Sequence, residues 1–331
     1  MNDFQLTRTL DEHAAETALR TDVLSGLTRF PKELPPKWFY DARGSELFEE
    51  ITRLPEYYPT RAEREILLER AQEIASVSGA RTLVELGSGS SEKTRHLIEA
   101  LPALETYVPV DVSESALTGA AEALLADHPG LRVHALLADF TRPLRLPESA
   151  GPRLVVFLGG TIGNLLPPER AVFLASVRAM LSPGDALLLG TDLVKDEAVL
   201  VAAYDDAQGV TAEFNKNVLA VIDRELGADF HTADFAHVAV WNREHEWIEM
   251  RLRAREAVTV KVRALDLVVP FEAGEEILTE VSAKFRQEGV RRELAAAGLE
   301  LSHWWTDSAG RFALSLSVAD GVAAGAGGTA G

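Results

Sequence analysis

The sequence predicts an α/β protein in which a mostly parallel sheet is covered by helices, with a second, smaller α+β domain attached to it. Strand-like and helix-like runs alternate between residues 82 and 190, the pattern of a parallel sheet with helices on both faces. A turn with two closely spaced glycines, Gly87 and Gly89, follows the first of these runs. After Asp192 the alternation ends, and segments with the two-residue period of antiparallel strands replace it.

The amino-terminal part of the chain predicts helices separated by proline-rich and aromatic turns. Apolar residues at helical spacing predict a helix over 12–27, and the prolines within 31–36 break it. A short helix at 46–52 stands between aromatic segments that contain Tyr40 and Tyr57, and a longer helix follows over 61–77. Tyrosines in such turns often pack with the hydroxyl at the surface; the alternative is a wall whose hydroxyls face a polar ligand.

Polar residues follow several of the strands expected in the alternating region. The strands are predicted at 82–86, 107–110, 132–137, 154–158 and 186–189. Asp111 ends the second strand, and Asp139 with Phe140 follows the third. A glycine-rich turn with Gly159 and Asn164 follows the fourth. Each could be a cap or turn residue, but ligands of parallel sheets bind at the carboxyl ends of strands, where a carboxylate suits a ribose diol and a phenyl ring suits adenine.

The glycine turn discriminates among three nucleotide-like cofactors. Gly87 and Gly89 allow a sharp turn and a close approach of the backbone to a ligand. Residues 87–94 come near to a P-loop and to a dinucleotide fingerprint, but Glu92 stands where both motifs require a small residue. ATP or GTP hydrolysis is therefore not expected, and an NAD-dependent oxidoreductase is disfavoured. S-adenosylmethionine carries no phosphate, so the turn favours it as the cofactor.

The composition indicates a soluble protein of the cytoplasm. The chain carries 33 basic and 51 acidic residues, and its net charge of −18 repels nucleic acid and anionic membranes. No apolar run is long enough to cross a bilayer, and the amino terminus lacks a signal-type core. Without cysteine there is no thiolate zinc site, and the 8 histidines show no metal-ligand spacing, so no metal is expected.

The remainder of the chain predicts an insertion and then the end of the sheet. Helices are expected at 198–204 and 212–226, and strands at 235–241, 247–252 and 257–262. A helix at 289–297 and a closing hairpin of strands at 299–304 and 312–318 follow. Residues 319–331 are rich in alanine and glycine and are expected to be disordered.

Long motifs scattered along the chain resemble those of the histidine-specific Nα-methyltransferases of ergothioneine biosynthesis. They are Pro-Pro-Lys-Trp-Phe-Tyr-Asp (35–41), Leu-Pro-Glu-Tyr-Tyr-Pro-Thr-Arg (54–61), Leu-Val-Glu-Leu-Gly-Ser-Gly (83–89), Gly-Thr-Ile-Gly-Asn (160–164), Asp-Leu-Val-Lys-Asp (192–196) and Leu-Thr-Glu-Val-Ser (278–282). The likeness runs from about residue 10 to residue 318. It implies a Rossmann-like class I methyltransferase sheet and stepwise transfer of three methyl groups from S-adenosylmethionine to the α-amine of L-histidine, which gives hercynine.

The resemblance also implies a division of the chain and a set of contacts. Residues 61–192 and 287–318 would form the S-adenosylmethionine-binding domain and residues 1–60 and 193–286 the substrate-binding domain, in a protein expected to be a monomer. The family's cofactor contacts match Gly87, Lys93, Asp111, Asp139 and Phe140. Its substrate contacts match Tyr57, Asn164, Tyr204, Glu280 and Ser282, with Tyr40, Gly159 and Met250 as further pocket members.

Substrate identity depends on Glu280 and Ser282, because relatives in the wider family methylate other amino acids. If this segment is extended, the two side chains leave the same face of the strand. A carboxylate that accepts from the N–H of a neutral imidazole and a hydroxyl that donates to its bare nitrogen would recognise the ring at both ends. Asn164, Tyr57 and Tyr204 are expected to bind the carboxylate and amine end.

Several points stay open in the sequence. Gly160 stands where the resemblance leads us to expect serine, and a missing hydroxyl there would loosen the turn. The group that takes the proton from the amine is not assigned, so no residue is named as catalytic. The alternatives are an N-methyltransferase of another amino acid and a non-catalytic S-adenosylmethionine sensor, which would keep Gly87, Asp111 and Asp139 without needing the substrate residues together.

Overall fold

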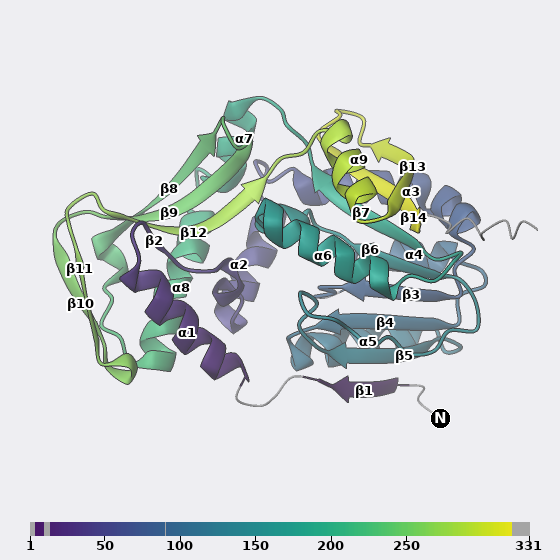
Figure 1. Cartoon of the computed structure of the whole chain (residues 1–331), viewed down its shortest axis with the longest axis horizontal. Coiled ribbons are helices and arrows are strands. Elements are labelled where there is room, and N and C mark those ends of the chain that lie inside the picture. Colours follow the sequence, from purple (N-terminus) through teal and green to yellow (C-terminus); the bar gives the residue numbers. More distant parts are fainter. Residues whose placement is uncertain (1–3, 10–13, 90, 320–331) are drawn as a thin grey trace, which may run out of the picture.

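A computed structural model of the chain describes residues 4–9, 14–89 and 91–319 (Figure 1). Figure 1 shows a large sheet with its helices on one side of the view and a smaller sheet, with α1, α7 and α8, on the other. The tail that the sequence predicts to be disordered lies outside the described residues from residue 320 onward.

The larger sheet has eight strands in the order β1-β5-β4-β3-β6-β7-β14-β13. They are β1 (Phe4–Arg8), β3 (Thr82–Leu86), β4 (Thr106–Asp111), β5 (Arg132–Leu137), β6 (Arg153–Phe157), β7 (Ala186–Asp192), β13 (Leu299–Thr306) and β14 (Phe312–Ala319). Strands β1 and β3 to β7 run parallel, whereas β14 and β13 are antiparallel additions at one edge. The predicted strands and the closing hairpin are all present, and the predicted Rossmann-like α/β fold is confirmed. The strand order reverses beside β3, the position where ligands of such sheets bind.

Helices cover both faces of this sheet. One face carries α3 (Pro59–Ser78), α4 (Arg95–Ala100) and α5 (Glu114–Asp127), and the other α6 (Pro167–Met180) and α9 (Gln287–Ala296). Neighbouring strand residues point to opposite faces, so that Leu83 belongs to the core under α3 and Val84 to the core under α6. Both are fully buried, which explains why β3 carries apolar residues at consecutive positions.

A second core is built from segments far apart in the sequence. Its sheet has the order β2-β12-β9-β8, and β10 and β11 form a separate two-stranded ribbon. The strands are β2 (Lys32–Glu33), β8 (Phe235–Asn242), β9 (Trp247–Ala254), β10 (Val258–Val262), β11 (Leu267–Phe271) and β12 (Glu276–Ala283). The helices are α1 (Ala14–Thr28), α2 (Ala42–Arg53), α7 (Glu197–Tyr204) and α8 (Val210–Leu226), and short 3-10 helices occur at η1 (Pro36–Phe39), η2 (Thr161–Asn164), η3 (Thr232–Asp234) and η4 (Arg263–Leu265). The fully buried members of this core come from residues 19–58 and 200–277.

The prediction that all of residues 1–60 belong with the second core is wrong for β1. This strand pairs in parallel with β5, from Phe4 opposite Val133 to Arg8 opposite Leu137. It therefore lies at the edge of the larger sheet. A strand of 5 residues with few apolar side chains carries no signal for the partner that it will choose. The sequence also does not predict β11, whose partly exposed strand carries Pro270.

None of the helices in the described part of the chain combines the length and the apolar composition needed to span a bilayer. Across residues 4–9, 14–89 and 91–319, no group of three or more His, Asp or Glu side chains is arranged to hold a metal ion.

Candidate active site

The glycine turn after β3 packs against the residue predicted to face adenine. Gly87 and Gly89 have φ angles of +68° and +49°, which L side chains rarely adopt. The N–H of Gly87 donates to the carbonyl of Val110 at 2.8 Å. A Cβ added at Gly87 would lie 3.3 Å from the Phe140 ring, so glycine allows the turn and this ring to meet.

Asp111 and Asp139 are oriented by nearby donors. Asp111 accepts from the backbone N–H of Gly89 and from that of Ser113, each at 2.9 Å and each with a different oxygen. Asp139 accepts with Oδ1 from the backbone N–H of Thr141 at 2.9 Å and from its hydroxyl at 2.6 Å. An ionised carboxylate offers about four lone-pair positions, so both groups keep capacity for a ligand.

Lys93 is joined to the loop that follows β6. Its ammonium pairs with the fully buried carboxylate of Glu63, on α3. The other oxygen of Glu63 accepts from the backbone N–H of Gly159 at 2.7 Å. A single carboxylate therefore links a predicted cofactor residue to a predicted pocket residue. The sequence missed Glu63, because nothing in a charged helix marks the one carboxylate that turns inward.

A cluster of buried polar side chains lies next to the glycine turn. Glu85 accepts from the hydroxyls of Thr94 and Tyr107, and Ser91 Oγ lies 2.7 Å from the Tyr107 hydroxyl. Burial raises the pKa of Glu85 to about 7, although the hydrogen bonds from Thr94 and Tyr107 act to lower it. These contacts tie β3, β4 and the residues after the turn together.

The turn also presents a buried hydroxyl that a ligand can satisfy. Within the described residues Ser88 Oγ is buried and has no hydrogen-bond partner. Such an unpaired group costs about 1–3 kcal/mol, so a polar ligand here would be stabilising. Close backbone approach, two carboxylates and one unpaired hydroxyl fit S-adenosylmethionine, whose adenosine and amino acid parts carry both donors and acceptors.

A pocket lies where the two cores meet. Its volume is about 520 Å³ when the open space at its mouth is included. It is lined by all of the predicted substrate residues, Tyr57, Asn164, Tyr204, Glu280 and Ser282, and by Tyr40, Gly159 and Met250. The loop after β6 and η2 supply part of the lining. The rest comes from Tyr40, α2, the segment before α3, α7, α8, β9 and β12.

Glu280 and Ser282 point to the same face because β12 is extended, as the sequence argument requires. They pair with Met250 and Ile248 of β9, after a register shift between Leu278 and Glu280. The two residues are only 8% and 7% exposed. Buried polar groups need partners: Ser282 has the Tyr204 hydroxyl and Lys284, and a substrate in the pocket can supply a partner to Glu280.

The ionisation of Glu280 is set by its surroundings. Burial raises its pKa to about 7, while the charge of Lys284 and the neighbouring Asn164 act to lower it. The Asn164 amide donates to the Val281 carbonyl at 2.8 Å and also faces the Glu280 carboxyl, so its oxygen is the atom that remains for a ligand. Near neutral pH, Glu280 can therefore accept from an imidazole N–H as a carboxylate or donate to a bare nitrogen as an acid.

Aromatic rings form one wall of the pocket. The ring centroid of Phe48 lies 5.6 Å from that of Tyr40, 6.2 Å from that of Tyr57 and 6.0 Å from that of Phe214. Tyr40 and Tyr57 thus line the pocket, and that their hydroxyls face a polar ligand stays a prediction. The sequence missed Phe48 and Phe214, because an apolar residue on an amphipathic helix does not reveal whether it will pack in a core or line a cavity.

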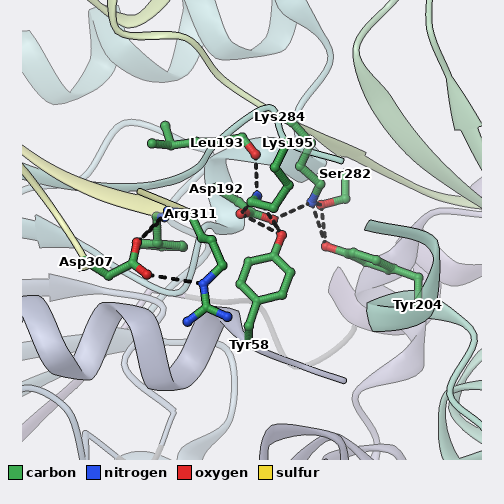
Figure 2. Close-up of polar contacts among 10 residues, drawn as sticks. Tyr58, Asp192, Leu193, Lys195, Tyr204, Ser282, Lys284, Asp307 and Arg311 are labelled. Atoms are coloured by element: carbon green, nitrogen blue, oxygen red, sulfur yellow. Dashed lines mark hydrogen bonds and ion pairs between the residues drawn. The ribbon is translucent and has the colours of Figure 1, made fainter. Parts of the chain in front are cut away.

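Behind the pocket lies a cluster of buried charges that the sequence did not predict (Figure 2). Asp192, at the end of β7, accepts from the Tyr58 hydroxyl at 2.8 Å and lies 2.6 Å from Lys195 Nζ and 2.9 Å from Lys284 Nζ. Burial acts to raise the pKa of Asp192, but the two ammonium groups hold it below its usual value. Burial also lowers the pKa of Lys195 to about 8, against the attraction of Asp192.

Lys284 connects this cluster to the pocket. Its Nζ lies 2.9 Å from the Tyr204 hydroxyl and 2.8 Å from Ser282 Oγ, and these two oxygens are 2.7 Å apart. One feature of the sequence could have indicated that Lys284 lies near the pocket: it follows Ser282 by two residues on the same segment. Nothing in the sequence indicates that it meets Asp192, which is 92 positions earlier (284 minus 192).

Gly160 has a backbone conformation that favours glycine. Its φ is +70°, and a Cβ there would lie 3.4 Å from the Phe312 ring. A serine would be strained in this conformation, so glycine suits the position; that the missing hydroxyl loosens the turn stays a prediction. Asn164 lines the pocket as expected despite the change.

Comparison with known proteins identifies the family and several relatives of the chain. Residues 19–319 match the family described as histidine-specific methyltransferase, SAM-dependent. The histidine N-alpha-methyltransferase of Mycolicibacterium smegmatis is 58% identical over 95% of this chain and 98% of its own length. That of Mycobacterium tuberculosis is 59% identical over 93% of this chain and 97% of its own. Ergothioneine biosynthesis protein 1 of Neurospora crassa is 33% identical over 88% of this chain and 34% of its own length.

The sheet and its strand-end turn define an S-adenosylmethionine-dependent methyltransferase. Within that class, the chain belongs to the histidine-specific methyltransferase family, as its motifs predicted.

Proposed function

We propose that the protein transfers three methyl groups in succession from S-adenosylmethionine to the α-amine of L-histidine and forms hercynine, a step of ergothioneine biosynthesis. One observation carries the proposal: the predicted substrate residues, which come from distant parts of the chain, line one pocket. That pocket lies beside the glycine turn, because Gly159 in its wall is linked through Glu63 to Lys93. Family membership and the names of the relatives support the assignment.

In this proposal Gly87, Lys93, Asp111, Asp139 and Phe140 hold S-adenosylmethionine. The cofactor supplies a methyl group on a sulfonium, which is already activated for transfer. We assign cofactor binding to residues 61–192 and 287–318 together with β1, and substrate binding to residues 14–60 and 193–286. The proposal gives no role to a metal ion.

The protein's own contribution is to place a neutral amine in a pocket from which water is largely excluded. Tyr57, Asn164 and Tyr204 offer hydroxyl and amide groups to the amine and carboxylate of histidine. Burial holds the pKa values of Tyr57 and Tyr204 well above their usual value, so near neutral pH they act as hydroxyls and not as phenolate bases. They can relay the proton that the amine releases but cannot keep it.

Glu280 and Ser282 would recognise the imidazole ring. A substrate that lacks ring nitrogens leaves the buried Glu280 carboxyl without a ring partner, which discriminates more strongly than shape. We further propose that the protein acts as a monomer in the cytoplasm, without nucleic acid or membrane partners, in keeping with its net charge of −18.

A competition experiment tests the substrate assignment. The protein is incubated with S-adenosylmethionine and an equimolar mixture of histidine, tryptophan, phenylalanine and leucine, and the methylated products are separated by mass spectrometry. We expect methylated histidine to dominate. Preferential methylation of another amino acid would contradict the assignment of histidine as the substrate. The assignment of the protein as a methyltransferase would still hold.

A further inference from the structure

Lys284 is a fully buried cation directly behind the substrate pocket. Its Nζ has three partners, Asp192 Oδ2 at 2.9 Å, the Tyr204 hydroxyl at 2.9 Å and Ser282 Oγ at 2.8 Å. An ammonium has three donors and no acceptor, so these partners use its whole hydrogen-bonding capacity. Figure 2 shows it between the carboxylate and the two hydroxyls.

A count of protons shows what the two hydroxyls can offer to a ligand. Because their oxygens are 2.7 Å apart, one hydroxyl donates to the other. Each oxygen also accepts from Lys284, which cannot accept in return. One hydroxyl proton therefore lies between Tyr204 and Ser282, and the other remains for the pocket. The oxygen that carries this free proton already accepts twice, so it has no lone pair left for a ligand N–H.

We propose that Lys284 is a positioning residue that makes the free hydroxyl of the Tyr204–Ser282 pair a hydrogen-bond donor only, with no acceptor position, toward the bound amino acid. The pocket then selects a ligand acceptor at this point, which in histidine is the bare ring nitrogen or a carboxylate oxygen. Asp192 holds the ammonium from behind, and is itself held by Tyr58 and Lys195. The inference rests on the proposed function, since it assigns a specificity device to the same pocket.

The chain offers a matched control for the test. Lys195 pairs with the same carboxylate and is also largely buried, but its other partners are the Tyr58 hydroxyl and the Leu193 carbonyl. We expect Lys284→Met to raise the KM for histidine about tenfold or more, the effect of about one hydrogen bond, with a smaller change in kcat and an unchanged Kd for S-adenosylmethionine. Lys195→Met should change this KM clearly less than Lys284→Met does, because Lys195 contacts neither pocket hydroxyl. Equal changes of KM in the two variants would overturn the proposal, because they would indicate a structural role only.

Two inhibitors identify which acceptor of histidine is selected. Histidinol lacks the carboxylate, and β-(2-thienyl)alanine lacks the ring nitrogens. Lys284→Met should weaken inhibition by one of them and leave the other unchanged. If inhibition by thienylalanine is unchanged, the selected acceptor is the ring nitrogen. If inhibition by histidinol is unchanged, the selected acceptor is the carboxylate. Equal weakening of both would contradict the proposal.

If Lys284→Met does not fold, the shared proton can be tested from the pocket side with Ser282→Ala, Tyr204→Phe and the double variant. Each single variant keeps one hydroxyl that accepts from Lys284 and donates to the pocket. The double variant should therefore lose far more in kcat/KM than the product of the two single losses. Independent, multiplicative losses would overturn the inference. The proposed function fails differently, since in that case the unsubstituted protein does not methylate histidine at all.

Discussion

The glycine turn and the substrate pocket are built in different ways. In the turn, the predicted residues stand at the ends of their own strands, and near neighbours orient them: Ser113 orients Asp111, and Thr141 orients Asp139. In the pocket, the contacts join distant parts of the chain. Tyr204 meets Ser282 across 78 positions, and Asn164 meets the Val281 carbonyl across 117. Residues of the larger sheet and its loops thus form the turn, whereas the packing of the two cores forms the pocket.

This difference predicts that substitutions in the two regions can be separated. A change in the turn should weaken cofactor binding and leave the recognition of histidine intact. A change in the pocket should do the reverse. The four predictions below test this separation.

The largest effect is expected from Glu280→Ala. Loss of a buried partner for the ring should cost about 2–4 kcal/mol in kcat/KM for histidine, with almost no change in cofactor affinity. Steady-state kinetics together with calorimetry of S-adenosylmethionine binding measure both quantities. Glu300→Ala, an exposed strand glutamate outside the pocket, serves as the control. A variant as active on histidine as the parent would remove the basis for histidine specificity.

On the other side of the comparison, Asp111→Ala should weaken S-adenosylmethionine binding by about 1.5–3 kcal/mol, the range for a hydrogen bond to a charged group. Part of this loss would come from the turn itself, since Asp111 also holds the backbone of Gly89. Calorimetry on Asp111→Ala and on Glu114→Ala, an exposed carboxylate nearby, checks the expectation. Unchanged affinity would mean that the ribose binds elsewhere.

The buried carboxylate of the pocket should also have a cost in stability. The pKa of Glu280 is raised from 4.5 to about 7, so the folded state holds this proton more tightly than the unfolded state. Its contribution to stability is present below pH 4.5 and is lost as the pH rises through 7. Glu280→Gln removes this titration. Its free energy of unfolding should therefore rise relative to that of the parent by on the order of 1–3 kcal/mol between about pH 5 and pH 8. Urea unfolding of the parent and the variant at both pH values measures this rise. If the difference between the two proteins does not depend on pH, Glu280 is not the titrating group.

The smallest effect concerns the substrate. Because the attacking amine must be neutral and an α-amino group titrates near pH 8, the methylation rate should rise about tenfold from pH 7 to pH 9. Initial rates at saturating histidine and cofactor measure this profile. A flat profile would mean that product release or a conformational step limits the rate.

The comparison also explains what the sequence could predict. The strands of the larger sheet and the residues at their ends follow from periodicity and from the glycine turn, because those signals are local. The motif resemblance added Tyr57, Tyr204, Glu280 and Ser282, which then proved to line one pocket. Their roles as contacts of histidine stay a prediction.

What the sequence could not predict depends on long-range packing. Lys284 and Asp192 are ordinary charged residues in the sequence, and their burial and pairing arise only when β7 and β12 are brought together. The same holds for Glu63, one of several glutamates on α3, and for β1, whose choice of β5 as partner leaves no local mark. A buried ion pair has no sequence signature, because each member looks like a surface residue until its partner is known.

The central claim is that the pocket holds histidine so that its α-amine receives methyl groups from S-adenosylmethionine. Mass spectrometry of histidine incubated with the protein and S-adenosylmethionine tests it most directly. We predict that products with one, two and then three added methyl groups appear in sequence, and that the trimethylated product accumulates. If histidine gains no methyl group while calorimetry shows that S-adenosylmethionine binds, the claim is contradicted and the protein is a cofactor-binding sensor.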